Sequence, residues 1–199
     1  MSESVRGRPR EFDADVALEA ALQLFWAQGF EATGVSELCE AMGIGKQSMY
    51  DWSGGKRGLY MKAIERYNEK YLCGLGPHLN APGSPLGNIL HCLHAMAEMA
   101  KMPSSPGCFL TNTRNEFGTS DEEIKRVTER LERYIIDSFC EALERARDAG
   151  EIPATTDCRA KASVIAVVRN GIMLAGRAGQ SAESIDETIA MIEVTLKSG

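Results

Sequence analysis

Four side chains that can hydrogen-bond to nucleic acid, Lys46, Gln47, Ser48 and Tyr50, follow the turn Gly43-Ile44-Gly45. Lys and Gln can contact the edges of purine bases, whereas the hydroxyls of Ser and Tyr suit phosphate oxygens. Residues at the N-terminus of a recognition helix reach base edges in the major groove, and the free N–H groups there favour phosphate. This run is therefore a candidate nucleic-acid contact.

Three arginines near the N-terminus, Arg6, Arg8 and Arg10, form a basic arm. Such an arm can lie along phosphates or enter a minor groove, although it can also be a solvated tail. Residues 1–57 carry six basic and nine acidic side chains, so this region is not basic overall. Any surface that faces DNA must come from the way those six cations cluster.

Cys108 is expected to begin a short helix over 107–117, where the helix dipole lowers the pKa of a thiol and raises its reactivity. Such a thiol could sense electrophiles or oxidants, or it could be a buried packing side chain. The sequence leaves both interpretations open.

His91, Cys92 and His94 place two imidazoles on one helix face, a spacing that can bind a metal. No second Cys/His cluster and no carboxylate-rich segment completes a ligand set nearby, so we expect surface or core histidines and no metal. The spacing supports no set of nucleophile, base and orienting group either. We therefore expect no cofactor and no enzymatic activity.

The composition is that of a globular protein: 199 residues, 44% hydrophobic, 25% charged, net charge −6. The acidity argues against nonspecific coating of nucleic acid. No apolar run is long enough for a membrane span, and the polar N-terminus does not read as a signal peptide. The six cysteines form no CxxC pair, so we expect reduced thiols and a cytoplasmic location.

Helical periodicity runs through the N-terminal part. The apolar positions of a first helix are followed by Gly29, with Asp13 or Asp15 able to cap its start. A second helix ends at the turn 43–45, and a third runs from Lys46 to about Trp52. Two short helices joined by a glycine turn are typical of a helix-turn-helix, although such pairs also occur in folds with no DNA role. A longer helix is expected over 56–71.

The C-terminal part also predicts helices. Gly and Pro residues predict a loop over 74–85, and Ser120 with Glu123 predicts a capping box at the start of a long helix. The last two helices are the expected dimer interface, although they could also be a monomer core. Their small and apolar residues are Gly171, Ala175, Gly176 and Ala178, then Ile185, Ile189, Ile192 and Leu196.

An ordered set of residues resembles the DNA-binding domain of the tetracycline-repressor (TetR) family over residues 10–65. The set is Gly29-Phe30-Glu31-Ala32-Thr33, Val35, Leu38, Ala41-Met42-Gly43-Ile44, Met49-Tyr50, Lys56 and Leu59. The resemblance implies that Thr33 and Lys56 contact backbone phosphates and that Lys46, Gln47, Ser48 and Tyr50 are recognition-helix contacts. It also implies a helical ligand-binding domain that dimerises through its last two helices.

This chain departs from the family pattern at three places. Ser53 stands where the family usually has an aromatic residue, and Trp52 either takes over that packing or lies against DNA. Gly45 and Gly55 stand where polar caps are common, and Gly is a slightly weaker N-cap than Ser or Asp.

The segment Gly107-Cys108-Phe109-Leu110 with Asn112 and Glu116 resembles a segment that lies beside the ligand pocket in one branch of the family. Met96, Met99, Met102, Phe109 and Phe117 could line an apolar pocket or simply be core. The expected pocket residues are Met96, Met99, Cys108, Phe109, Asn112 and Phe117.

Together these features predict an all-α protein of about nine helices, with a helix-turn-helix DNA-binding domain over 1–56 and a ligand-binding and dimerisation domain over 57–199. The expected function is a homodimeric repressor on palindromic double-stranded operator DNA, released by an unidentified small-molecule effector. The expected DNA contacts are Arg8, Arg10, Thr33, Lys46, Gln47, Ser48, Tyr50, Trp52 and Lys56. The alternatives are an activator of the same family, or a helical ligand- or metal-binding protein with no DNA role.

Overall fold

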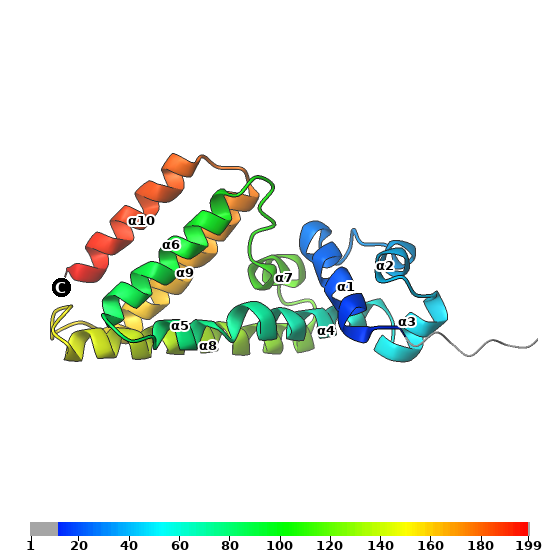
Figure 1. Ribbon diagram of the computed structural model, residues 1–199, viewed down its shortest axis with the longest axis horizontal. Helices are drawn as coiled ribbons and strands as arrows, with labels where there is room; N and C mark the ends of the chain where they lie inside the picture. Colours follow the sequence, from blue (N-terminus) through cyan, green and yellow to red (C-terminus); the bar gives the residue numbers. More distant parts are fainter. Residues whose placement is uncertain (1–11, 199) are drawn as a thin grey trace, which may run out of the picture. The chain divides into compact units, whose positions relative to one another are not determined.

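The computed structural model describes residues 12–198, which form α-helices and no strand. Its helices are α1 (Ala14–Gln28), α2 (Val35–Met42), α3 (Lys46–Ser53), α4 (Lys56–Tyr67), a π-helical turn (Asn68–Leu72), α5 (Leu75–Leu79), α6 (Pro85–Lys101), α7 (Phe109–Phe117), α8 (Glu122–Asp148), α9 (Cys158–Arg177) and α10 (Ala182–Lys197) (Figure 1). The predicted all-α class is confirmed. The arginines of the basic arm lie outside the described residues.

The chain divides between Ala63 and Ile64 into two compact units, and each has its own core. The predicted domain boundary at residue 56 stays a prediction. In the N-terminal unit the Phe25 ring meets the Tyr60 ring edge-on at 4.8 Å, and Phe30 packs on the same Tyr60 ring at 5.1 Å. Fully buried aliphatic side chains complete this core: Leu22, Leu38, Met49 and Leu59.

The first helix begins and ends where the sequence predicts. Oδ1 of Asp13 accepts hydrogen bonds from the backbone N–H groups of Asp15 and Val16, which leaves fewer unpaired donors in the first turn. Gly29 ends the helix with a φ of +90°, a conformation that favours glycine.

In the C-terminal unit the long helix α8 packs against α5, α6, α7 and α9, and α10 packs against α6 and α9 (Figure 1). Gly176 lets α9 approach α6 closely, because a Cβ there would lie 2.4 Å from the carbonyl oxygen of Ala100. Gly176, one of the small residues expected at a dimer interface, therefore serves a contact within the unit.

Two local predictions are wrong. Asp121, not Ser120, caps α8: its Oδ1 accepts from the N–H groups of Glu123 and Ile124 at 3.1 Å, while Ser120 Oγ donates to the carbonyl of Phe117. The segment 74–85 is not a loop throughout, since it contains α5. Pro77 lies in the first turn of α5, where its missing N–H has no partner to lose, and Leu79 anchors the helix in the core.

Candidate nucleic-acid interface and sensor cluster

The turn between α2 and α3 depends on glycine. Gly43 has a φ of +66°, a left-handed conformation, and its N–H donates to the carbonyl of Glu40 while the N–H of Ile44 donates to that of Cys39. These bonds end α2 in the way that helices commonly end. Gly45 is the N-cap residue of α3 and supplies no side-chain hydrogen bond. The second helix of the helix-turn-helix, α3, begins at Lys46 as predicted.

Helix α3 has one buried and one exposed face. Met49 is fully buried, and Ser53 is buried as well. Lys46, Gln47 and Tyr50 are exposed, Tyr50 with 51% of its surface accessible, and Ser48 is half-buried. Nε2 of Gln47 donates to Oδ1 of Asp51 at 2.8 Å, which orients the Gln47 amide. The helix thus presents an ammonium, an amide and a phenol group to solvent near its N-terminus.

The two residues expected to bind phosphate differ in exposure. Thr33 is 1% exposed, and its hydroxyl donates to the carbonyl of Gly29, so a phosphate contact would require that bond to open. Lys56 is half-buried: its Nζ donates to the carbonyl of Glu31 at 3.4 Å and lies 4.4 Å from the centre of the Phe30 ring. Both phosphate contacts stay predictions.

Trp52 has a packing environment. Its ring meets the Phe12 ring edge-on at 5.4 Å, and Nζ of Lys62 lies 5.4 Å from the ring centre. Of the two interpretations of Trp52, this geometry favours packing within the N-terminal unit, and a DNA contact stays a prediction. The hydroxyl of Ser53 donates to the carbonyl of Met49, so the small residue fits a buried helix end.

Gly58 is a structural position that the sequence reasoning missed. A Cβ at Gly58 would lie 1.8 Å from the carbonyl oxygen of Ser53, which no side chain can occupy without a backbone shift. The signal was present, because a Gly inside a predicted helix usually has a packing reason. This contact fixes how α4 follows α3.

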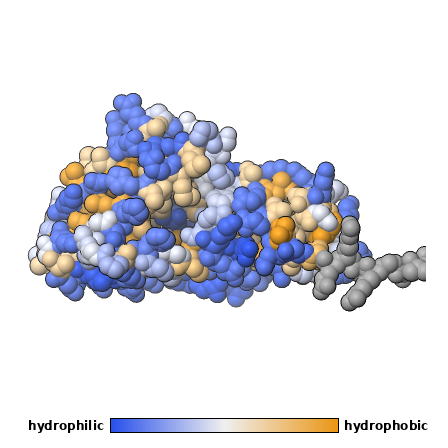
Figure 2. Space-filling view, in the orientation of Figure 1, coloured by the Kyte–Doolittle hydropathy of each residue, from blue (hydrophilic) through white to orange (hydrophobic). Residues whose placement is uncertain are grey.

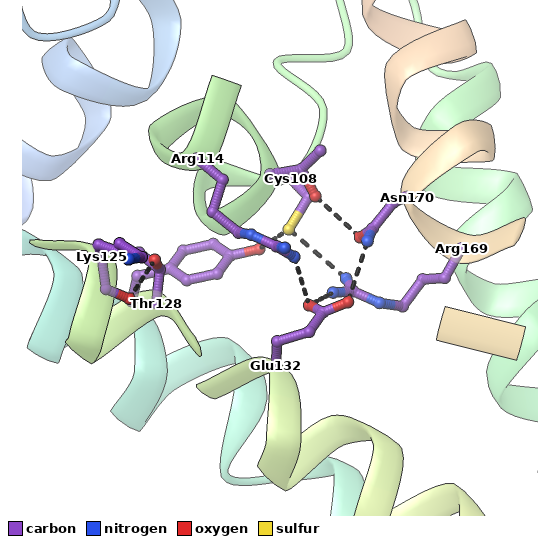
Figure 3. Close-up of polar contacts among 9 residues, drawn as sticks. Cys108, Arg114, Lys125, Thr128, Glu132, Arg169 and Asn170 are labelled. Carbon is purple, nitrogen blue, oxygen red and sulfur yellow. Dashed lines mark hydrogen bonds and ion pairs between the residues drawn. The ribbon is translucent and has the colours of Figure 1, made fainter. Parts of the chain in front are cut away.

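In the C-terminal unit Cys108 is the N-cap residue of α7 and is 1% exposed. The Tyr67 hydroxyl donates to its Sγ at 3.4 Å, and Nη1 of Arg169 donates to it at 3.5 Å. In Figure 3 the side chains of Arg114, Arg169 and Asn170 converge on the Glu132 carboxylate. The helix start predicted near Cys108 is thus joined to a buried polar cluster.

The charges of this cluster shift its pKa values in opposite directions. Burial raises the pKa of the Cys108 thiol, but the Arg169 cation and hydrogen bonds from Tyr67 and Thr111 outweigh burial, so the pKa lies below its ordinary value. Burial and the negative charge of Cys108 raise the pKa of Tyr67 well above its ordinary value. The cluster therefore makes the Cys108 thiol more acidic and the Tyr67 phenol less acidic than each is in water. The low exposure of Cys108 leaves both interpretations of this thiol, sensor and packing group, as predictions.

Glu132 and Arg169 are functional candidates that the sequence reasoning missed. Oε2 of Glu132 lies 3.5 Å from Nη2 of Arg169 and 3.4 Å from Nη1 of Arg114, and Oε1 accepts from Nδ2 of Asn170 at 3.0 Å. Arg169, the one charged residue of the mostly apolar stretch 164–175, was the available signal, because a buried charge needs a partner.

The six expected pocket residues do not share one environment. Cys108 and Phe109 are buried, Met96, Asn112 and Phe117 are half-buried, and Met99 is 42% exposed. Nδ2 of Asn112 donates to the carbonyl of Pro106. A cavity of about 480 Å³ lies between α7, α8 and α9, and other residues line it. A ligand pocket made by the six stays a prediction.

Residues 12–198 hold no group of three or more His, Cys, Asp and Glu side chains arranged to bind a metal ion. His94 Nε2 lies 2.5 Å from Oε1 of Glu193, and His91 is exposed. Across the same residues no helix combines the length and apolarity that a membrane crossing needs.

The N-terminal unit with its helix-turn-helix and the separate helical C-terminal unit are the features of a helix-turn-helix regulator. A family model described as bacterial regulatory proteins of the tetR family matches residues 17–62, and one described as a tetracyclin repressor-like C-terminal domain matches residues 87–192. The chain belongs to the TetR family of DNA-binding transcriptional regulators.

Similar proteins agree with this placement. YezE, an HTH-type transcriptional regulator of Bacillus subtilis, is 33% identical over 147 residues, which cover 73% of this chain and 76% of YezE. The HTH-type transcriptional repressor ComR of Escherichia coli is 28% identical over 186 residues, 90% of this chain and 87% of ComR. A solved structure of CifR, a TetR family regulator with substituted cysteines bound to 26-base-pair operator DNA, is 26% identical with a TM-score of 0.82 and covers 96% of this chain and 98% of CifR.

Proposed function

We propose that this chain is a ligand-responsive repressor that binds palindromic operator DNA as a homodimer in the cytoplasm. The observation that carries the proposal is the exposed N-terminal part of α3, with Lys46, Gln47 and Tyr50 in solvent above the buried Met49. The repressor name of ComR and the operator complex of CifR support the same role. Arg8, Arg10, Thr33, Ser48, Trp52 and Lys56 complete the proposed DNA contacts, and the proposed DNA-binding domain is 1–56.

A dimer through α9 and α10 is supported by exposed apolar side chains on both helices. Val167 is 71% exposed, Met191 66% and Val194 60%, and grooves between the two helices are lined by Val167 and by Met191. On the face drawn in Figure 2, apolar surface lies among hydrophilic surface over the C-terminal unit. Packing against a second copy would remove these side chains from water in a two-fold four-helix contact.

An effector releases such a dimer from DNA by changing the distance between its two DNA-binding domains. Two recognition helices must lie one DNA turn apart, about 34–36 Å, to bind both halves of a palindrome. A ligand that binds more tightly to a dimer with another spacing shifts the population away from DNA. Helix α4 is the element that connects the two units along the chain, and we propose that it carries the change.

A gel-shift titration with DNA from the chain's own upstream promoter tests the proposal. The wild-type protein is expected to bind one promoter fragment selectively, with an affinity that falls as salt rises. Lys46→Ala with Tyr50→Ala should weaken this binding at least tenfold, while the matched control Arg133→Ala, at an exposed position of α8, should not. Absence of any salt-sensitive, sequence-selective binding would contradict the proposal.

A promoter–reporter assay with and without the gene separates the repressor from an activator. Reporter output should rise when a repressor is deleted and fall when an activator is deleted. Ligand binding with no DNA association in either assay would favour a helical binding protein instead.

A further inference from the structure

The cavity between α7, α8 and α9 lies wholly within the C-terminal unit. Its volume of about 480 Å³ is that of a site for a small metabolite. Most of the residues that line it carry a charged, hydroxyl or amide group, and Leu174 is the large aliphatic side chain among them. Their apolar atoms also line the cavity, so the lining suits a small ligand that has both a polar group and an apolar part.

Two cations line the cavity, Arg114 from α7 and Lys125 from α8, against one carboxylate, Glu129. The Arg114 side chain is 41% exposed and that of Lys125 34% exposed, so both are open to a ligand as well as to their own partners. Those partners are loose: Arg114 lies 3.4 Å from Glu132, and Lys125 lies 3.6 Å from Glu122. A planar guanidinium with several donors matches a carboxylate in two parallel hydrogen bonds.

Hydrogen bonds orient the neutral polar side chains that line the rest of the cavity. The Thr111 hydroxyl donates to Oδ1 of Asn170 at 3.0 Å, and the Thr128 hydroxyl donates to the Lys125 carbonyl at 3.0 Å. Figure 3 shows Arg114, Lys125, Thr128 and Asn170 around this part of the unit. Hydroxyl and amide groups that are already oriented reduce the cost of ordering the site around a ligand.

We propose that this cavity binds a small organic anion with a carboxylate group, and that Arg114 and Lys125 hold that carboxylate. The assignment deepens the proposed function, on which it rests, because such an anion would be the effector. No residue of the cavity belongs to the six expected from the sequence.

Arg114 lines the cavity and also contacts Glu132 of the buried cluster, so an anion bound in the cavity can affect the interactions of that cluster. Arg114 and Arg169 both lie against Oε2 of Glu132. A ligand carboxylate that takes Arg114 leaves Glu132 with Arg169 as its cation and Asn170 as its amide donor, and Arg169 is also the cation beside Cys108. Ligand binding in the cavity therefore changes the ionic interactions of Glu132 and Arg169, which lie among α7, α8 and α9.

Titration calorimetry on the full-length protein without DNA tests the site, with acetate, succinate and benzoate as probes. At least one acid should bind, and its neutral amide should bind at least tenfold more weakly. Arg114→Gln and Lys125→Gln should each weaken binding roughly tenfold. The matched control is Arg133→Gln, which removes a cation from an exposed position of α8 outside this cavity and should leave binding unchanged.

Four results would overturn the assignment: no binding by any of the three acids, equal binding of acid and amide, an equal loss in the Arg133→Gln control, or equally tight binding of inorganic phosphate. Thermal unfolding of each variant by circular dichroism shows whether it is folded, and Arg114→Lys, which keeps the charge, should lose less affinity than Arg114→Gln. Because calorimetry needs no DNA, the site can fail while operator binding stands. The reverse also holds, since acid binding without operator binding would contradict only the repressor.

Discussion

Nη1 of Arg169 lies 3.5 Å from Sγ of Cys108, and both residues are at most 5% exposed. The cation comes from α9 and the thiol from the N-cap of α7, two elements separated by 61 residues along the chain. A buried guanidinium next to a thiol makes the ionised sulfur the better partner, since the interaction is weakly screened in the interior. The pair therefore couples the protonation of one side chain to the packing of α7 against α9.

The first prediction follows from the lowered pKa of Cys108. The native thiol loses its proton at a lower pH than the unfolded thiol, whose ordinary pKa is 9.0. The free energy of unfolding should therefore rise with pH relative to Cys108→Ser, starting near the native pKa and levelling off above pH 9.0. Urea unfolding curves of both proteins in reducing buffer, at several pH values from neutral upwards, measure this difference.

Cys140→Ser is the control for that experiment. Burial raises the pKa of Cys140, and the nearby Glu144 raises it further, so the native Cys140 thiol ionises at a higher pH than the unfolded one. The wild type should then lose stability relative to Cys140→Ser as pH rises through 9.0. A Cys108 difference that fell or stayed flat with pH would contradict the ion pair with Arg169.

The second prediction concerns Glu132, whose side chain is 13% exposed against 6% for Arg169. Glu132→Gln removes the carboxylate and leaves the Arg169 cation buried without this anion, with Sγ of Cys108 still 3.5 Å away. The free energy of unfolding should fall by about 3 kcal/mol, the scale for a broken buried ion pair. Urea denaturation measures the loss.

Arg159→Gln provides the contrast, because the Arg159–Asp137 pair is 56% exposed on both sides. Exposed pairs contribute little, so this variant should unfold much like the wild type. Equal losses from Glu132→Gln and Arg159→Gln would mean that burial of the first pair has no energetic consequence.

The third prediction is that Gly58→Ala destabilises the N-terminal unit. The added Cβ would lie 1.8 Å from the Ser53 carbonyl oxygen, so the end of α3 or the start of α4 must shift. Overpacking of this kind costs about 1–3 kcal/mol, and the thermal midpoint should fall accordingly. Gly45→Ser, at the N-cap of α3, has open space for its Cβ and should raise stability by a few tenths of a kcal/mol. A neutral Gly58→Ala variant would show that the close contact is absent in solution.

Periodicity and punctuation predicted most of the helices because they are local properties. Asp13 and Gly29 bound α1, and Gly43 ends α2, through contacts within a few residues of each position. The errors arose where two neighbouring residues compete for one role. Asp121 and Ser120 can both cap α8, and only the backbone path after Gly118 decides between them.

The buried cluster around Cys108 could not be predicted from local sequence patterns. Cys108 could be selected from its place at a helix start. Tyr67 and Arg169, which donate to its Sγ, and Glu132, which accepts from Arg169, come from three other elements. Their approach depends on how α8 and α9 pack, which no spacing within the sequence expresses. A charged residue, Arg169, within the mostly apolar stretch 164–175 was evidence that a partner exists, and only the fold identifies that partner.

The last prediction concerns the proposed dimer. Val167→Glu together with Met191→Glu puts charges on α9 and α10 at positions that are 71% and 66% exposed in the single chain. Neither side chain is part of the core of the unit, so the double variant should keep its helical content while burying charge at the interface prevents association. Sedimentation or light scattering should then show a monomer where the wild type is a dimer, and operator affinity should fall because two half-sites are no longer bound together. Val16→Glu, at a 65% exposed position of α1, should leave the dimer intact. If the double variant remains a dimer, association occurs through another surface.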